Sequence, residues 1–492
     1  MFEKVSPESV GVPSRRIGEY FRSLRLNGFA MHDVLMMRHG KLFTEEYWAP
    51  FHKDFCHRQY SQTKSYMSIA IGLLEAEGKL SLSAPIVSYF PDKIEGKIPE
   101  ELARQTVRDM LTMETGVHVP WWFGSDDPDR THLYLNRAQG VRPSATLWEY
   151  DSAGSQVLSS LVERLSGMTL FDYLYDRVFQ HLGTFQTAEI LKTRNGDSWG
   201  DSALLCTPRD MISFANLLLH GGVHEGRQLI PADYLREATS PQVYNDEDGW
   251  PDPFERGYGY QIWCTEEEGF AFVGMGGQLT VVLPKYDFVF VCNADVQGNP
   301  FAYNAIVRAM FDHIVYALKE GELPQEEEGT ALLREETKAL TLLSEGGRRH
   351  VALEEQIQGK TFLCEENPTG ITAFSFTFGE EGGVFRYENA SGKKELPFGL
   401  CRNEFCQFPE YGYSDGVGGV RTTNGFTYRA AVSAGWREEG KLSLRVQIID
   451  RYFGNMRAIF AFRGNEVAVS MRRSAEDFLH KYEGTFRGKM MQ

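Results

Sequence analysis

The chain has 492 residues, of which 42% are hydrophobic and 24% charged, and its 67 acidic and 51 basic residues give a formal charge of −16. This composition is that of an ordinary globular protein, and it excludes a disordered chain, a collagen-like fibre and a disulfide-dense mini-domain. A net-acidic chain without a block of Lys and Arg is also a poor candidate for binding the phosphate backbone of a nucleic acid.

The N-terminal residues 1–21 contain no apolar stretch behind a basic start, so we expect no signal peptide. The chain has no run of about 18 apolar residues, so we also expect no transmembrane helix. The seven cysteines are odd in number and scattered, which predicts reduced thiols. Together these features indicate a cytoplasmic protein.

Helix-like and strand-like segments alternate through residues 1–320. A hairpin is expected over 32–48, where two apolar segments flank the turn at 39–41. Apolar residues at helical spacing, together with start and stop signals, predict helices at 64–77, 101–113, 154–166, 169–181 and 207–219. Strands are then expected at 270–274, 278–283 and 287–293, followed by a closing helix at 300–318.

From residue 351 the pattern changes to period two, as in Tyr428, Ala430 and Val432, which predicts an antiparallel β unit forming a small barrel or sandwich. This part holds 18 acidic and 18 basic residues, so the whole negative excess lies before it. We therefore expect two domains, 1–325 and 351–492, joined by a polar linker at 326–350. No metal motif and no complete phosphate loop is present, and no cofactor is expected.

Acyl-transfer chemistry requires a nucleophile, a nearby base and donors for an oxyanion. Residues 196–200 match the pattern G-x-S-x-G around Ser198. A nucleophile elbow needs a strand ending at the serine and a helix starting on it. Polar residues precede Ser198 and the next helix begins only at Pro208, so we interpret this segment as a Gly-rich loop.

Two S-x-x-K motifs are the other candidates, and roughly two are expected by chance in a chain of this length. Ser391 lies in a polar turn and is interpreted as a hairpin tip. Ser61 begins a predicted helix, and Lys64 lies one turn later on the same face. The helix start adds unpaired N–H groups, and a lysine in an apolar pocket loses its proton more readily, as a base must. The alternative is a capping serine followed by a solvated lysine.

Two later segments favour the catalytic interpretation. Tyr150 and Ser152 precede a predicted helix, where the phenol would be a second proton carrier and Ser152 its hydrogen-bond partner. Gly274-Met275-Gly276-Gly277 lies between two predicted strands. Glycines at such a place let a strand approach a ligand and offer backbone donors.

The order of SQTK, YDS and a Gly-rich strand resembles the serine hydrolases related to class C β-lactamases and penicillin-binding proteins. Segments such as YSQTKSYMSIAIGLLEAEGKL, CTPRDMISFANLLLHGG and ERGYGYQIW extend the resemblance over about residues 5–320. It implies an α+β fold, an antiparallel sheet flanked by helices, in a protein of bacterial origin. The C-terminal unit is similar to the lipocalin-like, all-β appendages of some members.

The resemblance also implies roles for individual residues. Ser61 would be the acylated nucleophile, Lys64 its proton acceptor and Tyr150 the general acid and base for the leaving group and for water. Ser152 falls where members often carry a substrate-orienting Asn. The oxyanion hole would combine the N–H of Ser61 with one from Gly274–Gly277, for which Met275 and Gly276 are the two candidates.

The chain departs from the lactamases at one strand. They carry Lys-Thr-Gly or His-x-Gly there, whereas this sequence has Val273-Gly274-Met275 without a cation. The group expected to bind a β-lactam carboxylate is therefore missing, which favours a less charged ester or amide. The cluster at 121–123, with Trp122, follows His118 and is expected to line an apolar acyl pocket, with simple loop packing as the alternative.

The leading hypothesis is a serine hydrolase that cleaves an ester or amide bond of a small molecule through a Ser61 acyl-enzyme. A peptidase for D-amino-acid or small-peptide substrates, or an acyltransferase, would use the same site. A catalytically idle sensor or binding domain is the non-enzyme alternative. We expect neither nucleic acid nor membrane as a partner, and a homodimer is compatible with the sequence.

Overall fold

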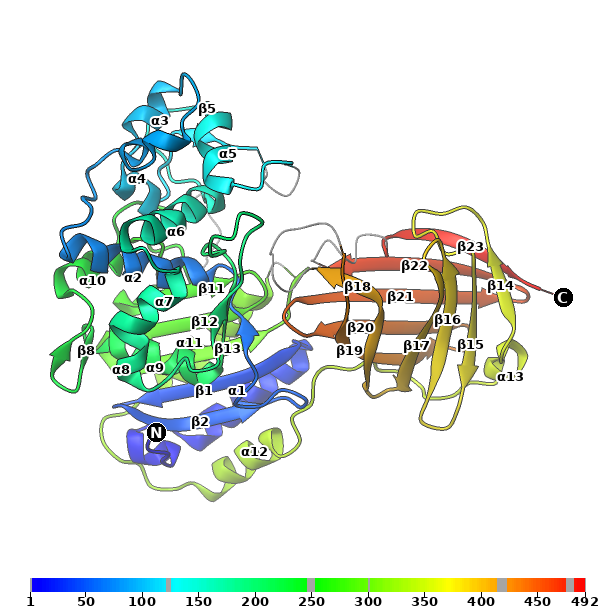
Figure 1. Cartoon of the computed structure of the whole chain (residues 1–492). Helices are drawn as coiled ribbons and strands as arrows, with labels where there is room; N and C mark the ends of the chain where they lie inside the picture. The colour runs from blue at the N-terminus through cyan, green and yellow to red at the C-terminus, as the bar shows by residue number, and fades with distance from the viewer. Residues whose placement is uncertain are drawn as a thin grey trace. The chain divides into compact units, whose positions relative to one another are not determined.

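The computed structural model describes residues 2–120, 125–245, 253–299, 301–413, 423–474 and 482–491, with the backbone alone at 412–413 and 423–426. The described residues form two compact units. The first is built from within 1–294 and 301–341, and the second from within 295–299 and 342–491. Figure 1 shows helices and a sheet in the first unit and strands in the second.

The first unit is organised around a six-stranded antiparallel sheet with the order β10-β11-β12-β13-β1-β2. The expected hairpin at 32–48 is confirmed, because β1 and β2 pair across the turn at His39 and Gly40. The strands are β1 Met31–Arg38, β2 Lys41–Tyr47, β10 Trp263–Cys264, β11 Phe270–Gly274, β12 Gln278–Leu283 and β13 Phe288–Ala294.

Helices cover both faces of this sheet (Figure 1). Tyr20 of α1 packs edge-on against Phe290 of β13, whereas Tyr66 of α2 and Phe214 of α9 both contact Phe272 of β11. The longer helices are α1 Ser14–Asn27, α2 Gln62–Ala76, α5 Arg130–Arg137, α6 Ser152–Ser166, α9 Pro208–Leu219, α11 Ala302–His313 and α12 Glu327–Thr337. The short helices of this unit are α3 Glu100–Arg104, α4 Val107–Leu111, α7 Leu170–Leu174, α8 Gln180–Leu182 and α10 Ala232–Ala238, and the second unit holds α13 Leu353–Ile357.

Two predicted helices are divided in the structure. The segment 101–113 forms α3 and α4, because Gln105 is extended and Thr106 starts a new helix with a capping box to Asp109. Segment 169–181 is likewise divided into α7, a single π-helical turn at Tyr175–Phe179 and α8. The expected helix at 207–219 is confirmed, with Thr207 as its cap and Pro208 in its first turn.

The polar segment after residue 325 holds a full helix in the first unit. Helix α12 packs along α1, and Glu336 receives hydrogen bonds from both Arg22 and Arg25. Glu326, just before α12, pairs with Arg15 of α1 in the same way. These surface ion pairs each contribute little, but together they fix the helix in register.

The second unit is an antiparallel β-barrel. The strands follow the order β17-β16-β15-β14-β23-β22-β21-β20-β19-β18, and β17 also pairs with β19, which closes nine strands into a ring. Aromatic rings pack inside, as between Phe376 and Phe460, whose centroids are 4.8 Å apart. The strands are β14 Thr361–Cys364, β15 Ala373–Phe378, β16 Gly382–Asn389, β17 Gly392–Leu400, β18 Glu404–Tyr413, β19 Thr423–Glu438, β20 Lys441–Ile449, β21 Phe453–Arg463, β22 Glu466–Ser474 and β23 Gly484–Met490. The expected α+β fold with an all-β C-terminal part is therefore confirmed.

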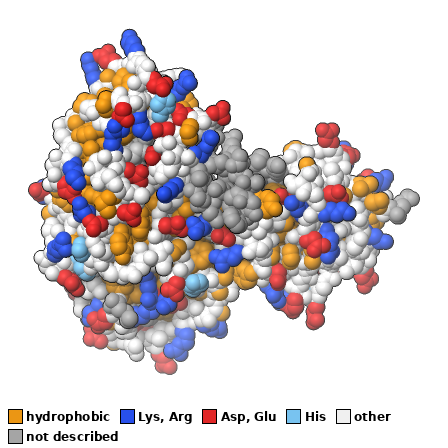
Figure 2. Space-filling model, viewed as in Figure 1, with side chains coloured by type: hydrophobic (Ala, Val, Ile, Leu, Met, Phe, Trp, Pro, Cys, Tyr) orange, Lys and Arg blue, Asp and Glu red, His pale blue; other side chains and the backbone are white. Residues whose placement is uncertain are grey.

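The visible surface carries acidic and basic side chains interspersed with one another (Figure 2). Within the described ranges, no helix has both the length and the apolar composition needed to cross a bilayer.

Candidate active site

Ser61 lies immediately before the first residue of α2. The chain reaches it through Tyr60, which has the left-handed backbone angle φ of +46° although it carries a side chain. Such a conformation is unfavourable in a non-glycine residue and is typical of functional sites. The backbone N–H groups of Gln62 and Thr63 bond to residues 59 and 60, whereas the N–H of Ser61 donates to no other described residue.

Lys64 lies beside Ser61, as their spacing predicts. Its Nζ donates to Ser61 Oγ at 3.1 Å and to the backbone carbonyl of Asp201 at 2.7 Å. The lysine is only 1% exposed, so the amine is held within the protein and aimed at the serine oxygen. A nucleophile and a base in hydrogen-bond contact are the geometric requirement for covalent catalysis.

The loop that contains the G-x-S-x-G pattern supplies Asp201 to this site. Ser198 is buried, its N–H donates to Glu163, and its carbonyl accepts from Gln156 of α6. The serine hydroxyl thus lies in a packed loop and not on a strand-to-helix elbow. The loop interpretation from the sequence agrees with this geometry.

Tyr150 lies on the other side of Lys64. The Lys64 Nζ lies 5.1 Å from the centroid of its ring, and the tyrosine is 37% exposed. Its ring stacks on Trp263 of β10, with centroids 6.0 Å apart, and Trp263 also contacts Trp148 and Tyr258. Tyr150 is therefore held by an aromatic wall while part of it faces solvent.

The Gly-rich segment forms the turn between β11 and β12. A Cβ at Gly274 would lie 2.6 Å from the carbonyl oxygen of Gln59, so this strand end packs directly on the segment that carries Ser61. The N–H of Gly276 donates to Gln278 Oε1, and Gln278 Nε2 donates to the carbonyl of Ala294. The N–H of Met275, in contrast, donates to no other described residue.

Ser152 is the first residue of α6, next to the helix cap Asp151. The Asp151 carboxylate accepts from the N–H of Gly154 and from the hydroxyl of Tyr134. Burial raises the pKa of Asp151, and these hydrogen bonds oppose the rise. Ser152 itself is half-buried, and no described hydrogen bond joins it to Lys64 or Tyr150.

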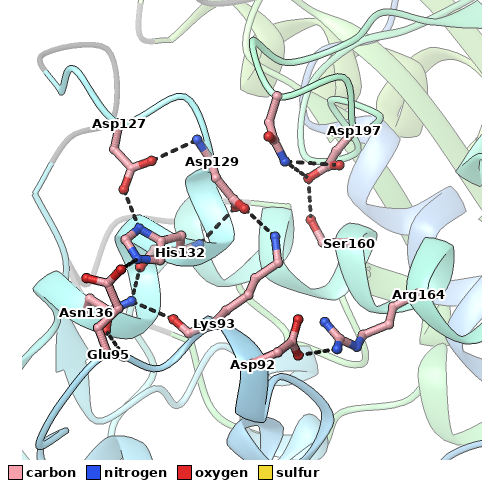
Figure 3. A network of polar contacts seen from close by, with 11 residues as sticks. Asp92, Lys93, Glu95, Asp127, Asp129, His132, Asn136, Ser160, Arg164 and Asp197 are labelled. Carbon is pink, nitrogen blue, oxygen red and sulfur yellow. Dashed lines mark hydrogen bonds and ion pairs between the residues drawn. The ribbon is translucent and has the colours of Figure 1, made fainter.

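Helix α5 carries a further cation to the site, and Figure 3 shows how its start is anchored. Asp129 caps the helix by accepting from the N–H of His132, and Lys93 pairs with the same carboxylate. The His132 ring contacts Asp127 at 2.6 Å, and this hydrogen bond raises the pKa of His132. Arg130, the first residue of α5, is thereby placed 3.7 Å from the carboxylate of Asp201.

One predicted residue does not join this cluster. His118 is exposed in β4 Val117–His118, which pairs with β5 Gln139–Gly140, and no described contact links it to Ser61. Trp122 lies outside the described residues. Val273 is half-buried on β11, where the resemblance would place a cation.

These features define a serine hydrolase of the β-lactamase-like class. The family model for Beta-lactamase matches residues 30–311, and the chain belongs to this family. The 6-aminohexanoate-dimer hydrolase of Paenarthrobacter ureafaciens is 26% identical over 289 residues, which cover 54% of this chain and 73% of that protein. Membership of this family identifies the chain as a serine hydrolase.

Solved structures show the same fold. A Bacillus anthracis protein, provisionally named 6-aminohexanoate-dimer hydrolase, superposes with a TM-score of 0.54 at 17% identity, over 63% of this chain and 86% of that one. A penicillin-binding protein homologue from Caulobacter crescentus superposes with a TM-score of 0.51 at 16% identity, over 63% of this chain and 98% of that one. At such low identity, these likenesses concern the fold alone.

Sequence reasoning missed Asp201, Arg130 and Trp263 as members of the site. Asp201 touches Lys64 through a backbone carbonyl, which every residue type possesses, so the sequence carries no signal for that contact. Trp263 ends the segment ERGYGYQIW, which contributed to the family resemblance but suggested no role for the ring.

Proposed function

We propose that the chain hydrolyses a neutral or weakly charged ester or amide of a small molecule through an acyl-enzyme on Ser61. The observation that carries the proposal is the 3.1 Å contact between Lys64 Nζ and Ser61 Oγ inside the protein. In the first step Lys64 takes the hydroxyl proton while Oγ bonds to the substrate carbonyl carbon. The developing oxyanion accepts from the N–H groups of Ser61 and Met275.

Tyr150 is the proposed carrier of the second proton. It would protonate the leaving group and then help water to attack the acyl-enzyme. The position of its ring next to the Lys64 amine, together with its partial exposure, supports this role. Ser152, at the start of α6, is proposed to orient the substrate.

The preference for low charge rests on Val273 and on the aromatic wall. Val273 provides no cation for a substrate carboxylate, whereas Trp263 and the 53% exposed Met275 offer apolar contact surface next to the proposed site. Pockets lined by apolar and aromatic side chains with few polar groups select substrates of that character.

The test compares hydrolysis of neutral p-nitrophenyl esters with that of a β-lactam and a carboxylate-bearing ester. We expect the neutral esters to have the highest kcat/KM, and Ser61→Ala to abolish the enzyme-dependent rate on all of them. Preference for the anionic substrates would overturn the charge argument, and wild-type activity of Ser61→Ala would overturn the nucleophile.

A further inference from the structure

The side chain of Asp201 lies next to the proposed base, and the family resemblance gave it no role. Asp201 is 3% exposed. Its Oδ2 lies 3.8 Å from Lys64 Nζ, and its Oδ1 lies 3.7 Å from a guanidinium nitrogen of Arg130. These separations are those of ion pairs, so the carboxylate sits between two cations from different helices.

The loop before Asp201 is held firmly in place. Gly200 has no room for a side chain, because a Cβ there would lie 2.1 Å from Ser159 Oγ of α6. The guanidinium groups of Arg58 and Arg130 lie 4.5 Å and 4.8 Å from the ring of Trp199. Arg58 also donates to the carbonyl of Ser202. The position of Asp201 is therefore fixed on both sides along the chain.

Asp201 is the negative charge that the described contacts place beside Lys64. Arg58 and Arg130 are cations at every relevant pH, and Lys64 becomes an ammonium ion when it takes the Ser61 proton. Asp201 is the carboxylate that the described contacts place among these three groups. Forming a buried ammonium ion on Lys64 without a nearby counter-ion would be costly.

We propose that Asp201 is a positioning residue that holds Lys64 against Ser61 and balances the ammonium charge formed during acylation. The inference rests on the proposed function. In the step concerned, the Ser61 O–H bond breaks and its proton moves to Lys64 Nζ. The Oγ–carbon bond forms, and the carbonyl electron pair moves to the substrate oxygen. Asp201 stabilises the resulting ammonium in two ways. Its carboxylate supplies an opposite charge, and its backbone carbonyl accepts a hydrogen bond from Nζ.

The protonation of Asp201 gives this role a signature in the pH profile. Burial raises the pKa of Asp201, whereas Lys64, Arg130 and Arg58 oppose that rise. The groups facing it are these three cations, with the Tyr150 ring beyond Lys64. As the pH falls, protonation of Asp201 removes the counter-ion, so activity declines on the acid limb.

The test measures kcat/KM against pH for Asp201→Asn and Arg130→Gln. In Asp201→Asn the plateau should fall about tenfold or more. Its acid limb should be lost, because residue 201 can no longer be protonated in this pH range. In Arg130→Gln the limb should move to higher pH, because loss of a cation raises the pKa of Asp201.

Asp197→Asn is the matched control. Asp197 lies in the same loop, but its carboxylate accepts a hydrogen bond from Ser160 of α6 (Figure 3). We expect the pH profile of this variant to keep the plateau and the acid limb of the wild type. A lowered plateau with an unmoved limb in Asp201→Asn would indicate a merely structural role and overturn the inference. If Asp201→Asn does not fold, Arg130→Gln alone tests the inference. A shift of its acid limb to higher pH would support the inference, and an unmoved limb or a shift to lower pH would overturn it. An inactive Ser61→Ala combined with unmoved limbs would refute this inference but leave the proposed function standing.

Discussion

Gly274 sets how closely the turn between β11 and β12 approaches Ser61, the proposed nucleophile. A side chain there would meet the Gln59 carbonyl, a backbone atom two residues before Ser61, and also Gln278 Oε1 at 2.8 Å. Gln278 in turn holds the N–H of Gly276. The absence of a side chain at one residue therefore lets two segments more than 200 residues apart meet at the site.

Substituting Gly274 by Ala should separate these two segments. Backbone must move to relieve the contact, and a displacement of about 1 Å at a catalytic site costs about a hundredfold in rate. We expect a large loss in kcat/KM on a neutral p-nitrophenyl ester, with overpacking costing about 1–3 kcal/mol of stability.

Gly96→Ala provides the control for Gly274→Ala, since a Cβ at Gly96 meets nothing within 4 Å. This variant should keep wild-type activity. Full activity of Gly274→Ala would refute the idea that close packing on Gln59 matters for catalysis.

At the scale of individual residues, the sequence predicted only part of the candidate site. Ser61 and Lys64 were found because residues one helical turn apart share a face, and their contact follows from local geometry. The sequence could not distinguish Met275 from Gly276 as the proposed oxyanion donor. The distinction depends on the Gln278 side chain, which accepts a hydrogen bond from the Gly276 N–H. Asp201 and Trp263 reach the site through tertiary packing of loops, which no local pattern encodes.

At the scale of elements, β2 places two neighbouring carboxyl groups in opposite environments. Glu45 accepts hydrogen bonds from Arg209 of α9 and from Tyr47, and the pKa of Glu45 is lowered to about 2 by these partners and Lys4 against the effect of burial. Burial raises the pKa of Glu46 to about 7. Because successive strand residues point to opposite faces, only one of the pair reaches the arginine.

The two positions should therefore affect stability with opposite sign. The ionised Glu45 stabilises the fold above its unfolded pKa of about 4.3. This contribution is lost as the pH falls towards 2, so Glu45→Gln should lower the Tm at pH 8 and have less effect below pH ~4. Ionised Glu46 costs stability above the same unfolded value, so Glu46→Gln should raise the Tm at pH 8.

Thermal unfolding of both variants between pH 8 and pH 4 checks this pair, with the wild type as reference. Equal effects of the two substitutions at pH 8, or a Glu45→Gln deficit that grows on acidification, would contradict the assignment of the Arg209 pair as the stabilising one.

Elements with strong end signals were predicted well, and those that depend on tertiary context were not. The capping box at Thr207 and the strands β11 and β12 agree with the expected ranges. The division at Gln105 was missed because the apolar spacing continues across it. There the Gln105 side chain bonds to Tyr134 and to the N–H of Gly116, contacts that a helical periodicity cannot reveal.

At the scale of the whole molecule, the change of pattern near residue 351 correctly indicated an antiparallel β unit. Its closure depends on pairing between β17 and β19 and between β14 and β23, which lie far apart in the chain. Within this unit a buried Glu345, from the segment expected to be a linker, accepts from Arg437, Arg457 and Ser443. Composition marked that segment as polar but did not show that one of its carboxylates is an integral part of the β unit.

The central claim, an acyl-enzyme on Ser61, is tested most directly by intact-protein mass spectrometry after reaction with a fluorophosphonate, followed by peptide mapping. The account predicts one adduct per chain on the peptide containing Ser61, no adduct in Ser61→Ala, and slower labelling in Asp201→Asn. An adduct on another serine such as Ser198 or Ser391, or undiminished labelling of Ser61→Ala, would contradict it.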